Sequence, residues 1–435
     1  MKKIFISIIL LAIVGYGLYQ ANNGFNFERS KKSAQTIASL REKLAETSIK
    51  NNAFVANKNM NVYQIADSFN GDYKARQNVL KRSSDVRGVY LTQLIANASS
   101  QDLNAQSILS NVKNLLRETE LNAVVIDVKS TDNFQLSDSL KDLINKLHQD
   151  NIWVIARFVT FRDSSLINKK PELYIKDNNG NLWKDSKGYY WLDPASSQVQ
   201  KYLIDLSYKI IDFGFDEIQF DYMRFPVNSD NIVYPFYNNK IEKREIIREF
   251  CLKLRNNLRD YKKSIIISVD LFGEVALHPL SLNIGQDLAD FVDVFDYISF
   301  MIYPSHFFSG FSVNKDLKRN LPALYFPYES DNIFSVVSNN PYDVVYRSLL
   351  SANDYIPLFY SEKKYQPQCL GKNNFPLFCP QAKIRPWLQD FNLKIDSDRG
   401  ISYDYQKVKS EIKASKDAGP FGWLLWNPAN FYSIH

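Results

Sequence analysis

Little in this sequence points to a metal, a nucleotide or a thiol as the reacting group. The 435 residues include three cysteines and four histidines, and no His-Glu-x-x-His pattern occurs, so a zinc site is not expected. No Gly-x-Gly-x-x-Gly motif follows the first strand-like run and no phosphate-cradling loop is present, which argues against a dinucleotide-binding fold. A Gly-x-Ser-x-Gly elbow for a serine nucleophile is also missing. We therefore expect no cofactor and no metal.

Long runs of one charge are missing as well. The chain has 53 Lys and Arg against 47 Asp and Glu, a formal net charge of +6, and no block of five or more basic residues. Nucleic-acid-binding proteins usually gather basic residues on one face or in one segment. We therefore expect no nucleic-acid partner.

A strongly apolar run lies at the N-terminus. Met1, Lys2 and Lys3 precede the apolar residues 4–14, and Gly15 and Gly17 offer a small-x-small cleavage site. A basic start followed by an apolar run of this length is typical of an export signal. We interpret residues 1–21 as a signal peptide or, if uncleaved, a membrane anchor, and residues 22–85 as a polar spacer that is partly helical or disordered. Both outcomes place the rest of the chain outside the cytoplasm, in the periplasm or cell envelope.

The three cysteines have two expected roles. Cys251 lies in a helical pattern and is expected to be a small core residue. Cys369 and Cys379 bracket a loop rich in Gly, Asn and Pro, and in an exported protein they can form a disulfide.

From residue 86 onward, β-branched and aromatic runs alternate with helix-period segments. Eight runs have the pattern of strands: 86–92, 123–129, 153–161, 217–224, 265–272, 295–303, 384–391 and 422–426. Helices are expected at 105–118, 137–149, 197–213, 243–260, 287–292, 341–352 and 403–418. Eight βα units favour an α/β fold of the (β/α)₈ TIM-barrel type over residues 86–435. A doubly wound open sheet is the alternative, and the missing glycine motif argues against it.

Carboxylates and other polar residues stand where several of these runs end. Asp127 lies in the second half of the second run, Asp221 in that of the fourth and Asp270 in that of the fifth, and Glu274 follows the fifth run. Because strand side chains alternate between faces, Asp221 shares a face with Gln219, and Asp270 shares one with Ser268. Carboxylates that converge at a barrel mouth are what glycosidic cleavage needs, since one protonates the leaving oxygen and a second attacks the anomeric carbon or activates water. The expected acid/base is Asp270 or Glu274, and either can instead be a loop-capping carboxylate.

Other residues at the same strand ends are candidates for substrate binding. Aromatic residues make up 14% of the chain, and their faces suit the apolar faces of sugars, although core packing explains many of them. The candidate binding residues are Asp127, Lys129, Arg157, Arg224, Tyr303, His306, Arg385, Trp387, Gln389 and Trp426. Asp127 with Lys129 is also interpretable as a structural pair at the mouth, and Asp221 with Arg224 as a structural ion pair.

Several segments together resemble a known family. They include Arg87-Gly88-Val89-Tyr90, Ile155-Ala156-Arg157-Phe158, the segment from Gly214 to Pro226, Ser299 to His306, and Arg385 to Phe391. In order and spacing, residues 86–428 resemble the glycoside hydrolase domains of bacterial envelope proteins, TIM barrels distantly similar to α-amylase-type enzymes. The resemblance implies that Asp221, at the end of the fourth strand, stands where related barrels carry their nucleophile.

Two functions follow as expectations. The first is a glycoside hydrolase or transglycosidase that acts on an envelope or extracellular carbohydrate through paired carboxylates. The second is a non-catalytic carbohydrate-binding or scaffold barrel of the envelope, which would keep the aromatic residues without two carboxylates at catalytic separation. The expected partners are an oligo- or polysaccharide and, if residues 1–21 are retained, the membrane.

Overall fold

The computed structural model describes residues 72, 74–227, 232–238, 240–278, 283–361 with side chains to 357, 382–419 and 422–434. The expected signal or anchor, most of the spacer, and the expected Cys369–Cys379 disulfide lie outside the described residues. Residues Met1–Gln77 and Asn78–His435 are separate units, and the second unit is described below. Among the described residues, no helix is both long enough and apolar enough to cross a membrane.

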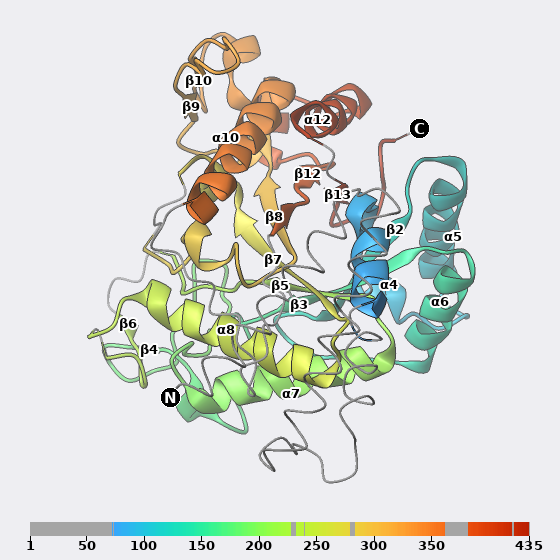
Figure 1. Cartoon of the computed structure of the whole chain (residues 1–435), viewed down its shortest axis with the longest axis vertical. Coiled ribbons are helices and arrows are strands. Elements are labelled where there is room, and N and C mark those ends of the chain that lie inside the picture. The colour runs from blue at the N-terminus through green and yellow to red at the C-terminus, as the bar shows by residue number, and fades with distance from the viewer. Residues whose placement is uncertain are drawn as a thin grey trace, which may run out of the picture. The chain divides into compact units, whose positions relative to one another are not determined.

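Eight strand positions form a closed, parallel barrel (Figure 1). Each position pairs with the next and the last pairs with the first. In this order the strands are β1 (Arg87–Leu91), β2 (Ala123–Lys129), β3 (Trp153–Val159), β5 (Glu217–Asp221), β7 (Ile266–Phe272), β8 (Tyr297–Ile302), β12 (Trp387–Gln389) and β13 (Trp423–Trp426). The predicted (β/α)₈ TIM barrel is confirmed, and all eight predicted runs contribute to it.

The seventh strand position is divided in two. The short strand β11 (Lys383–Ile384) pairs with β8, and β12 begins only at Trp387. Pro386 lies in the gap, where a residue without an N–H group interrupts the hydrogen bonding of a central strand. There is no room for a side chain just before β13, because a Cβ atom on Gly422 would lie 1.9 Å from the carbonyl oxygen of Val86.

Helices follow most strands, as the alternating pattern predicted. They are α4 (Gln93–Ala96), α5 (Leu103–Glu118), α6 (Asp138–Gln149), α7 (Ser197–Phe213), α8 (Lys243–Tyr261), α9 (Gly273–Leu277), α10 (Pro341–Ser361), α11 (Lys394–Asp398) and α12 (Tyr405–Ala418). Four of them begin at a side chain that accepts a hydrogen bond from the first turn: Asp102, Ser137, Ser196 and Asp404. Helices α7 and α8 lie side by side along one side of the barrel (Figure 1).

The predicted helix at 287–292 is shorter in the structure. Only the 3₁₀ turn η3 (Leu288–Asp290) forms there. The remaining short elements are the 3₁₀ turns η1 (Ser83–Asp85), η2 (Pro171–Leu173), η4 (Pro304–His306), η5 (Ile333–Ser335) and η6 (Val337–Asn339), and the antiparallel pairs β4 (Lys176–Asp177) with β6 (Ile232–Val233) and β9 (Phe311–Val313) with β10 (Leu324–Phe326).

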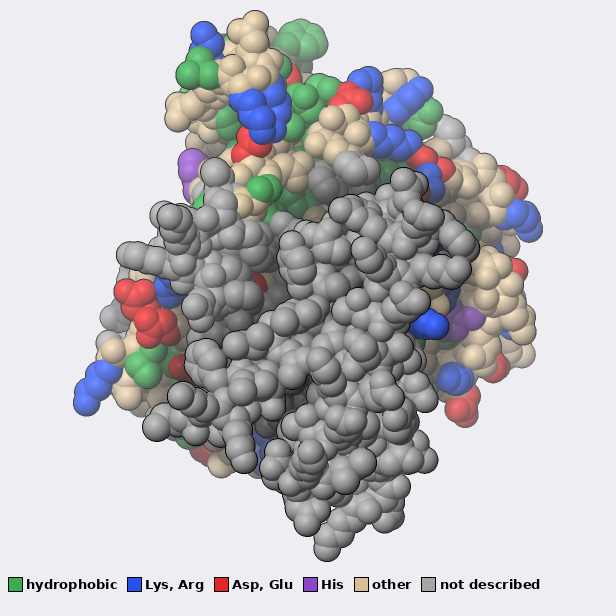
Figure 2. All heavy atoms as spheres, in the orientation of Figure 1, with side chains coloured by type: hydrophobic (Ala, Val, Ile, Leu, Met, Phe, Trp, Pro, Cys, Tyr) green, Lys and Arg blue, Asp and Glu red, His purple; other side chains and the backbone are tan. Residues whose placement is uncertain are grey.

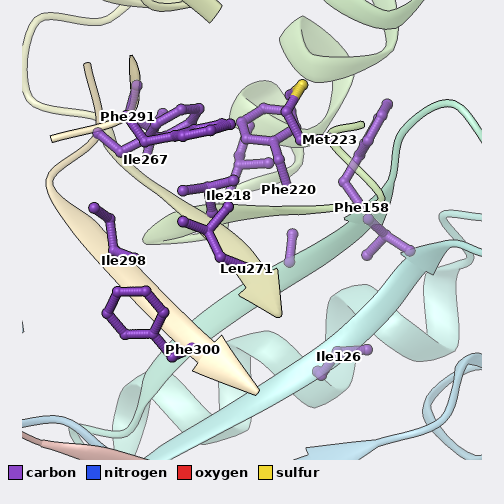
Figure 3. Packing of buried hydrophobic residues seen from close by; sticks show 14 of the residues in the cluster. Ile126, Phe158, Ile218, Phe220, Met223, Ile267, Leu271, Phe291, Ile298 and Phe300 are labelled. Carbon is purple, nitrogen blue, oxygen red and sulfur yellow. The ribbon is translucent and has the colours of Figure 1, made fainter. Parts of the chain in front are cut away.

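Two apolar cores lie on the two faces of the strands. The larger core fills the space between strands and helices, and Figure 3 shows Ile126, Phe158 and Phe220 among its residues. Cys251 is buried in this core, as expected. The smaller core fills the barrel interior. It comprises every second residue along the strands, on the face that points inward, including Tyr90, Ile155, Tyr297 and Trp387. Because these apolar residues fill the middle of the interior, polar side chains that also point inward lie at one of the two ends of the barrel.

Charged side chains of both signs are visible on the parts of the described surface that Figure 2 shows. Lys and Arg side chains are interspersed there with Asp and Glu. This agrees with the absence of a basic block in the sequence.

Candidate active site

The carboxyl ends of β2, β5 and β7 bring three carboxylates to one arginine. Arg157 of β3 donates from Nη1 to Asp127 Oδ1 at 2.7 Å and from Nη2 to Asp221 Oδ2, and its Nε lies 3.9 Å from Asp270 Oδ2. Burial alone would lower the pKa of Arg157, but the negative charges of Asp127 and Asp221 raise it well above its ordinary value. The predicted convergence of Asp221 with Asp270 is therefore present, with Arg157 between them.

Aromatic side chains support this cluster from the other side of the barrel. The hydroxyl of Tyr90 donates to Asp127 Oδ2 at 2.6 Å, and the indole of Trp387 donates to Asp270 Oδ1 at 2.9 Å. The guanidinium of Arg157 lies 4.8 Å from the ring centre of Trp426, within cation–π range. Four of the predicted binding residues, Asp127, Arg157, Trp387 and Trp426, thus lie within the cluster.

The surroundings of Asp270 raise the pKa of its carboxyl group. Its side chain is 1% exposed. Burial and then the charge of Asp221 raise its pKa well above the ordinary range, although Arg157 and Trp387 oppose the shift. A protonated carboxyl next to a second, ion-paired carboxylate is the arrangement that general acid catalysis uses.

Glu274, the other acid/base candidate, lies outside this cluster. It is half-buried in the first turn of α9, directly after β7. Within the described part of the chain its carboxylate makes no hydrogen bond or ion pair. Gly273 precedes it because a Cβ atom there would lie 2.6 Å from the carbonyl oxygen of Met301. The structure therefore places Asp270, and not Glu274, against Arg157.

An aromatic wall, which we define as Tyr303, His306, Phe308 and Phe391, follows β8 and β12. The ring centres of Tyr303, His306 and Phe391 lie 5.3–5.5 Å apart, and Phe308 stacks on His306 at 5.7 Å. Burial and the charges of Asp270 and Asp221 raise the pKa of Tyr303 well above its ordinary value. Phe308 is 59% exposed, so the wall extends from the carboxylates to the surface.

Lys129 is not paired with Asp127. The pairing of β2 with β3 shifts register between Asp127 and Lys129, so this β-bulge turns the two side chains to different faces. Lys129 is buried and pairs with Asp163 at 2.7 Å. The interpretation of Asp127 and Lys129 as a structural pair at the mouth was wrong, and the bulge is the reason.

Arg385 lies at the opposite end of the barrel. Its Nη1 is 2.9 Å from Glu217 Oε1, and its guanidinium lies 3.9 Å from the ring centre of Tyr297. Glu217 and Tyr297 are the first residues of β5 and β8. This corrects the expected placement of Arg385 with the mouth residues, because Arg385 stands near the start of the predicted run 384–391 and therefore at the amino end of the seventh strand position.

Gln389 and Arg224 lie near the mouth but do not contact the carboxylates. Gln389 exchanges hydrogen bonds with Ser305, accepting from its backbone N–H at 3.1 Å and donating to its hydroxyl at 2.8 Å. It thereby fixes the turn that follows β8. Arg224 donates to the carbonyl oxygen of Phe225 at 3.0 Å. Because Asp221 pairs with Arg157, the alternative of a structural Asp221–Arg224 ion pair was wrong.

Two neighbouring features were not predicted from the sequence. Tyr90 was recognised only as part of a motif, although its parity on β1 places it inside the barrel. Asp390 follows β12 and lines a cavity of about 380 Å³ with Phe391, Asn392, Tyr403 and residues 427–429 and 431–433. Burial raises the pKa of Asp390 to about 7, although the N–H of Ser433 donates to it at 2.8 Å. Asp390 directly follows Gln389 at the carboxyl end of a predicted strand, and this position could have marked it as a residue of the mouth.

The raised pKa of Asp390 predicts a pH-dependent stability. An unfolded aspartate has a pKa of about 3.9, so between about pH 4 and pH 7 the folded protein retains a proton that the unfolded chain has lost. Stability therefore falls as pH rises through this window. Asp390→Asn has no carboxyl group to titrate here and so does not lose stability in this way. We therefore expect its free energy of unfolding, relative to that of wild type, to increase by about 1–4 kcal/mol when the pH is raised from 5 to 8. Urea unfolding of both proteins at pH 5 and pH 8 measures these free energies. An equal difference between variant and wild type at the two pH values would contradict the raised pKa of Asp390.

In the described residues, no group of three or more His, Cys, Asp or Glu side chains has a geometry that could hold a metal ion. The arrangement at the mouth is thus one of carboxylates, one guanidinium and aromatic rings.

Several solved structures are similar to this chain, and one of them supports the barrel fold. The glycoside hydrolase domain of PgaB (BpsB) from Bordetella bronchiseptica is 12% identical, with a TM-score of 0.51 over 80% of this chain and 94% of that one. An α-galactosidase from Thermus thermophilus is 12% identical, with a TM-score of 0.45 over 80% of this chain and 59% of that one. A hypothetical protein from Ruminiclostridium thermocellum is 32% identical over 42% of this chain and 96% of that one, with a TM-score of 0.35.

Comparison with curated proteins found no match. The family described as "Putative glycosyl hydrolase domain" matches residues 88–432. This range includes all residues of the mouth cluster and all eight barrel strands, except for the first residue of β1. The chain belongs to this glycosyl hydrolase domain family.

Proposed function

We propose that this protein is an exported glycoside hydrolase or transglycosidase that acts on an envelope or extracellular carbohydrate. The observation that carries the proposal is the placement of Asp221 and Asp270 on one guanidinium at the carboxyl end of the barrel. Active sites of TIM barrels lie at this end. The export signal expected in residues 1–21 supports the location, and the family membership supports the reaction class.

The proposed roles follow from the different surroundings of the two carboxyls. Asp270, whose pKa is raised by burial and by Asp221, donates its proton to the glycosidic oxygen. Asp221 then attacks the anomeric carbon or activates a water molecule. Arg157 keeps the carboxylates in place, and the aromatic wall offers ring faces to the sugar.

A screen of glycans tests the proposal. Purified wild-type protein is incubated with polysaccharides of bacterial envelopes and with extracellular glycans, and new reducing ends are measured. We expect at least one glycan to be cleaved, and Asp221→Asn prepared in the same way to be inactive. No cleavage of any glycan, or equal cleavage by the variant, would contradict the proposal. The anomer formed first then separates retention from inversion.

Asp270 predicts how activity depends on pH. A general acid must be protonated, so kcat/KM should fall as pH rises through its pKa, which lies above the ordinary carboxyl range. Asp270→Asn should abolish this alkaline limb and lower activity by about 10²–10⁴-fold on natural glycans. Aryl glycosides, whose leaving group needs little protonation, should lose much less. An equal loss on both substrates would assign Asp270 a structural role.

The second candidate is a non-catalytic carbohydrate-binding barrel. Its support is the near-complete burial of Asp221 and Asp270, which are 4% and 1% exposed, as expected of a closed ion-pair cluster. The aromatic wall would then be the binding surface. Glycan binding by calorimetry, together with no turnover by wild type, would favour this candidate.

A further inference from the structure

We infer that the barrel mouth beside Asp221 binds an anionic group of the substrate, a carboxylate, phosphate or sulfate carried by a sugar, through Arg224 and Arg162. This inference rests on the proposed hydrolase function and names the chemical class of its substrate. It begins from an arginine that the proposed reaction does not use.

Arg224 is buried without a countercharge. Its side chain is 8% exposed, and its guanidinium lies 4.7–5.0 Å from the ring centres of Trp191, Tyr222 and Phe272. It makes one hydrogen bond, to the carbonyl oxygen of Phe225, and no ion pair with any described carboxylate. Its remaining N–H groups have no partner in the described chain and are not sealed from solvent. They are therefore free to meet a ligand.

The nearest carboxylates are already engaged. Burial lowers the pKa of Arg224 to about 10, while Asp221 and Asp185 oppose the shift without reaching ion-pair distance. Asp221 is bound by Arg157, and Asp185 accepts a hydrogen bond from the indole of Trp191 at 3.0 Å. A buried charge of this kind is costly unless paired, and three aromatic faces offset only part of the cost. A bound anion would supply the missing partner.

A second arginine contacts the same tyrosine ring. The guanidinium of Arg162 lies 3.8 Å from the ring centre of Tyr222 and 4.5 Å from that of Tyr189. Its Nε donates to Thr131 at 3.1 Å, and its terminal N–H groups have no partner among the described residues. Tyr222 directly follows Asp221 and has a positive φ of 54°, a conformation that a bulky residue adopts only where the surroundings require it. Both arginines thus lie beside the proposed nucleophile.

Two guanidinium groups suit an anion better than a neutral sugar. Each planar fork can donate two parallel hydrogen bonds to a carboxylate, phosphate or sulfate. Asp127, Asp221 and Asp270 hold Arg157, so Arg157 is not available for this role. An anionic substituent held by Arg224 would lie next to the reacting bond and not on the carboxylates themselves.

Calorimetric titration of the full chain tests the inference. The probes are methyl glucuronoside, glucose 6-phosphate and glucose 6-sulfate, each compared with methyl glucoside or glucose at equal ionic strength. We expect at least one anionic probe to bind and the neutral sugars to bind at least about tenfold more weakly. Which anion binds best separates a uronate from a phosphate or sulfate ester.

Two variants and one control make the test specific. Arg224→Lys keeps the charge but loses the fork, and we expect about tenfold weaker anion binding. Arg162→Ala, at a half-buried position, should also weaken it. Lys394→Gln removes an exposed lysine that pairs with Asp398 on α11 and should bind like wild type. Thermal melting confirms that each variant is folded.

Failure of this inference is distinguishable from failure of the proposed function. Equal binding of neutral and anionic probes, no binding of any anion, or wild-type anion affinity in folded Arg224→Lys and Arg162→Ala would overturn the inference. Cleavage of neutral glycans would then still support the hydrolase. Anion binding that persists in Asp221→Asn supports the inference, whether or not any glycan is cleaved.

Discussion

Asp221→Asn is expected to lower glycan turnover by about 10⁴-fold or more, because it removes the carboxylate proposed to attack the anomeric carbon or activate water. The variant preserves the shape of the side chain. Asp221 Oδ1 accepts the N–H of Tyr222 at 2.6 Å and Oδ2 accepts from Arg157, so an amide oxygen can keep only one of these contacts. We expect a stability loss of about 1–3 kcal/mol and glycan affinity near that of wild type.

Asp127→Asn is the matched control for this substitution. Asp127 binds the same guanidinium at 2.7 Å and also accepts from Tyr90, but it has no proposed part in bond cleavage. Its loss should affect stability as much as the loss of Asp221 and turnover far less. Initial rates and urea unfolding of both variants provide the comparison. Equal loss of turnover in the two variants would mean that Asp221 acts only by holding Arg157.

A small external nucleophile gives a second readout for Asp221. In Asp221→Ala the missing carboxylate leaves space beside the anomeric carbon, and added azide or formate should restore part of the turnover on an activated aryl glycoside if Asp221 is a nucleophile. Such a rescue would form a glycosyl azide that mass spectrometry detects. A merely structural role of Asp221 would leave the rate independent of azide.

The barrel and the parity of its carboxylates were predictable from local pattern. Each strand run combines β-branched residues with a polar end, and the alternation of side chains places Gln219 with Asp221, and Ser268 with Asp270. The closed barrel could be predicted from the count of βα units, because eight parallel strands with crossover helices have few other ways to bury both faces of the sheet. The convergence of Asp221 and Asp270 followed from these two facts alone.

The partners of individual charges were not predictable in the same way. Arg157 was a candidate binding residue, but its role in joining Asp127, Asp221 and Asp270 depends on contacts between strands that lie far apart in the chain. Lys129 was misplaced because a single-residue bulge reverses parity without any sequence signal as clear as glycine or proline. The prediction for Arg385 was wrong because this residue stands at the start of the seventh strand position, and only residues near the carboxyl ends of the strands reach the mouth.

Arg157→Gln should destabilise the protein by about 3–5 kcal/mol at neutral pH, since it leaves Asp127, Asp221 and Asp270 facing one another without their shared cation. Arg157 opposes the upward pKa shift of Asp270, so its removal raises that pKa further. The folded variant then retains protons that the unfolded chain has lost, and its stability falls as pH rises above about 4. Urea unfolding should therefore show a larger deficit at pH 8 than at pH 5.

Arg385→Gln is the control for Arg157→Gln. It also breaks a buried ion pair, but at a residue outside the proposed site, so it separates the loss of stability from the loss of a site residue. It leaves Glu217 buried at the amino end of the barrel, with Trp153 still donating to that carboxylate at 3.0 Å. We expect a comparable loss of stability. Turnover per folded molecule should stay near wild type, because Arg385 lies at the end opposite the proposed site, whereas Arg157→Gln should lose turnover even where it is fully folded. If both variants retain turnover, the carboxylates do not depend on Arg157 for their geometry, and if both lose it equally, the mouth is not the catalytic end of the barrel.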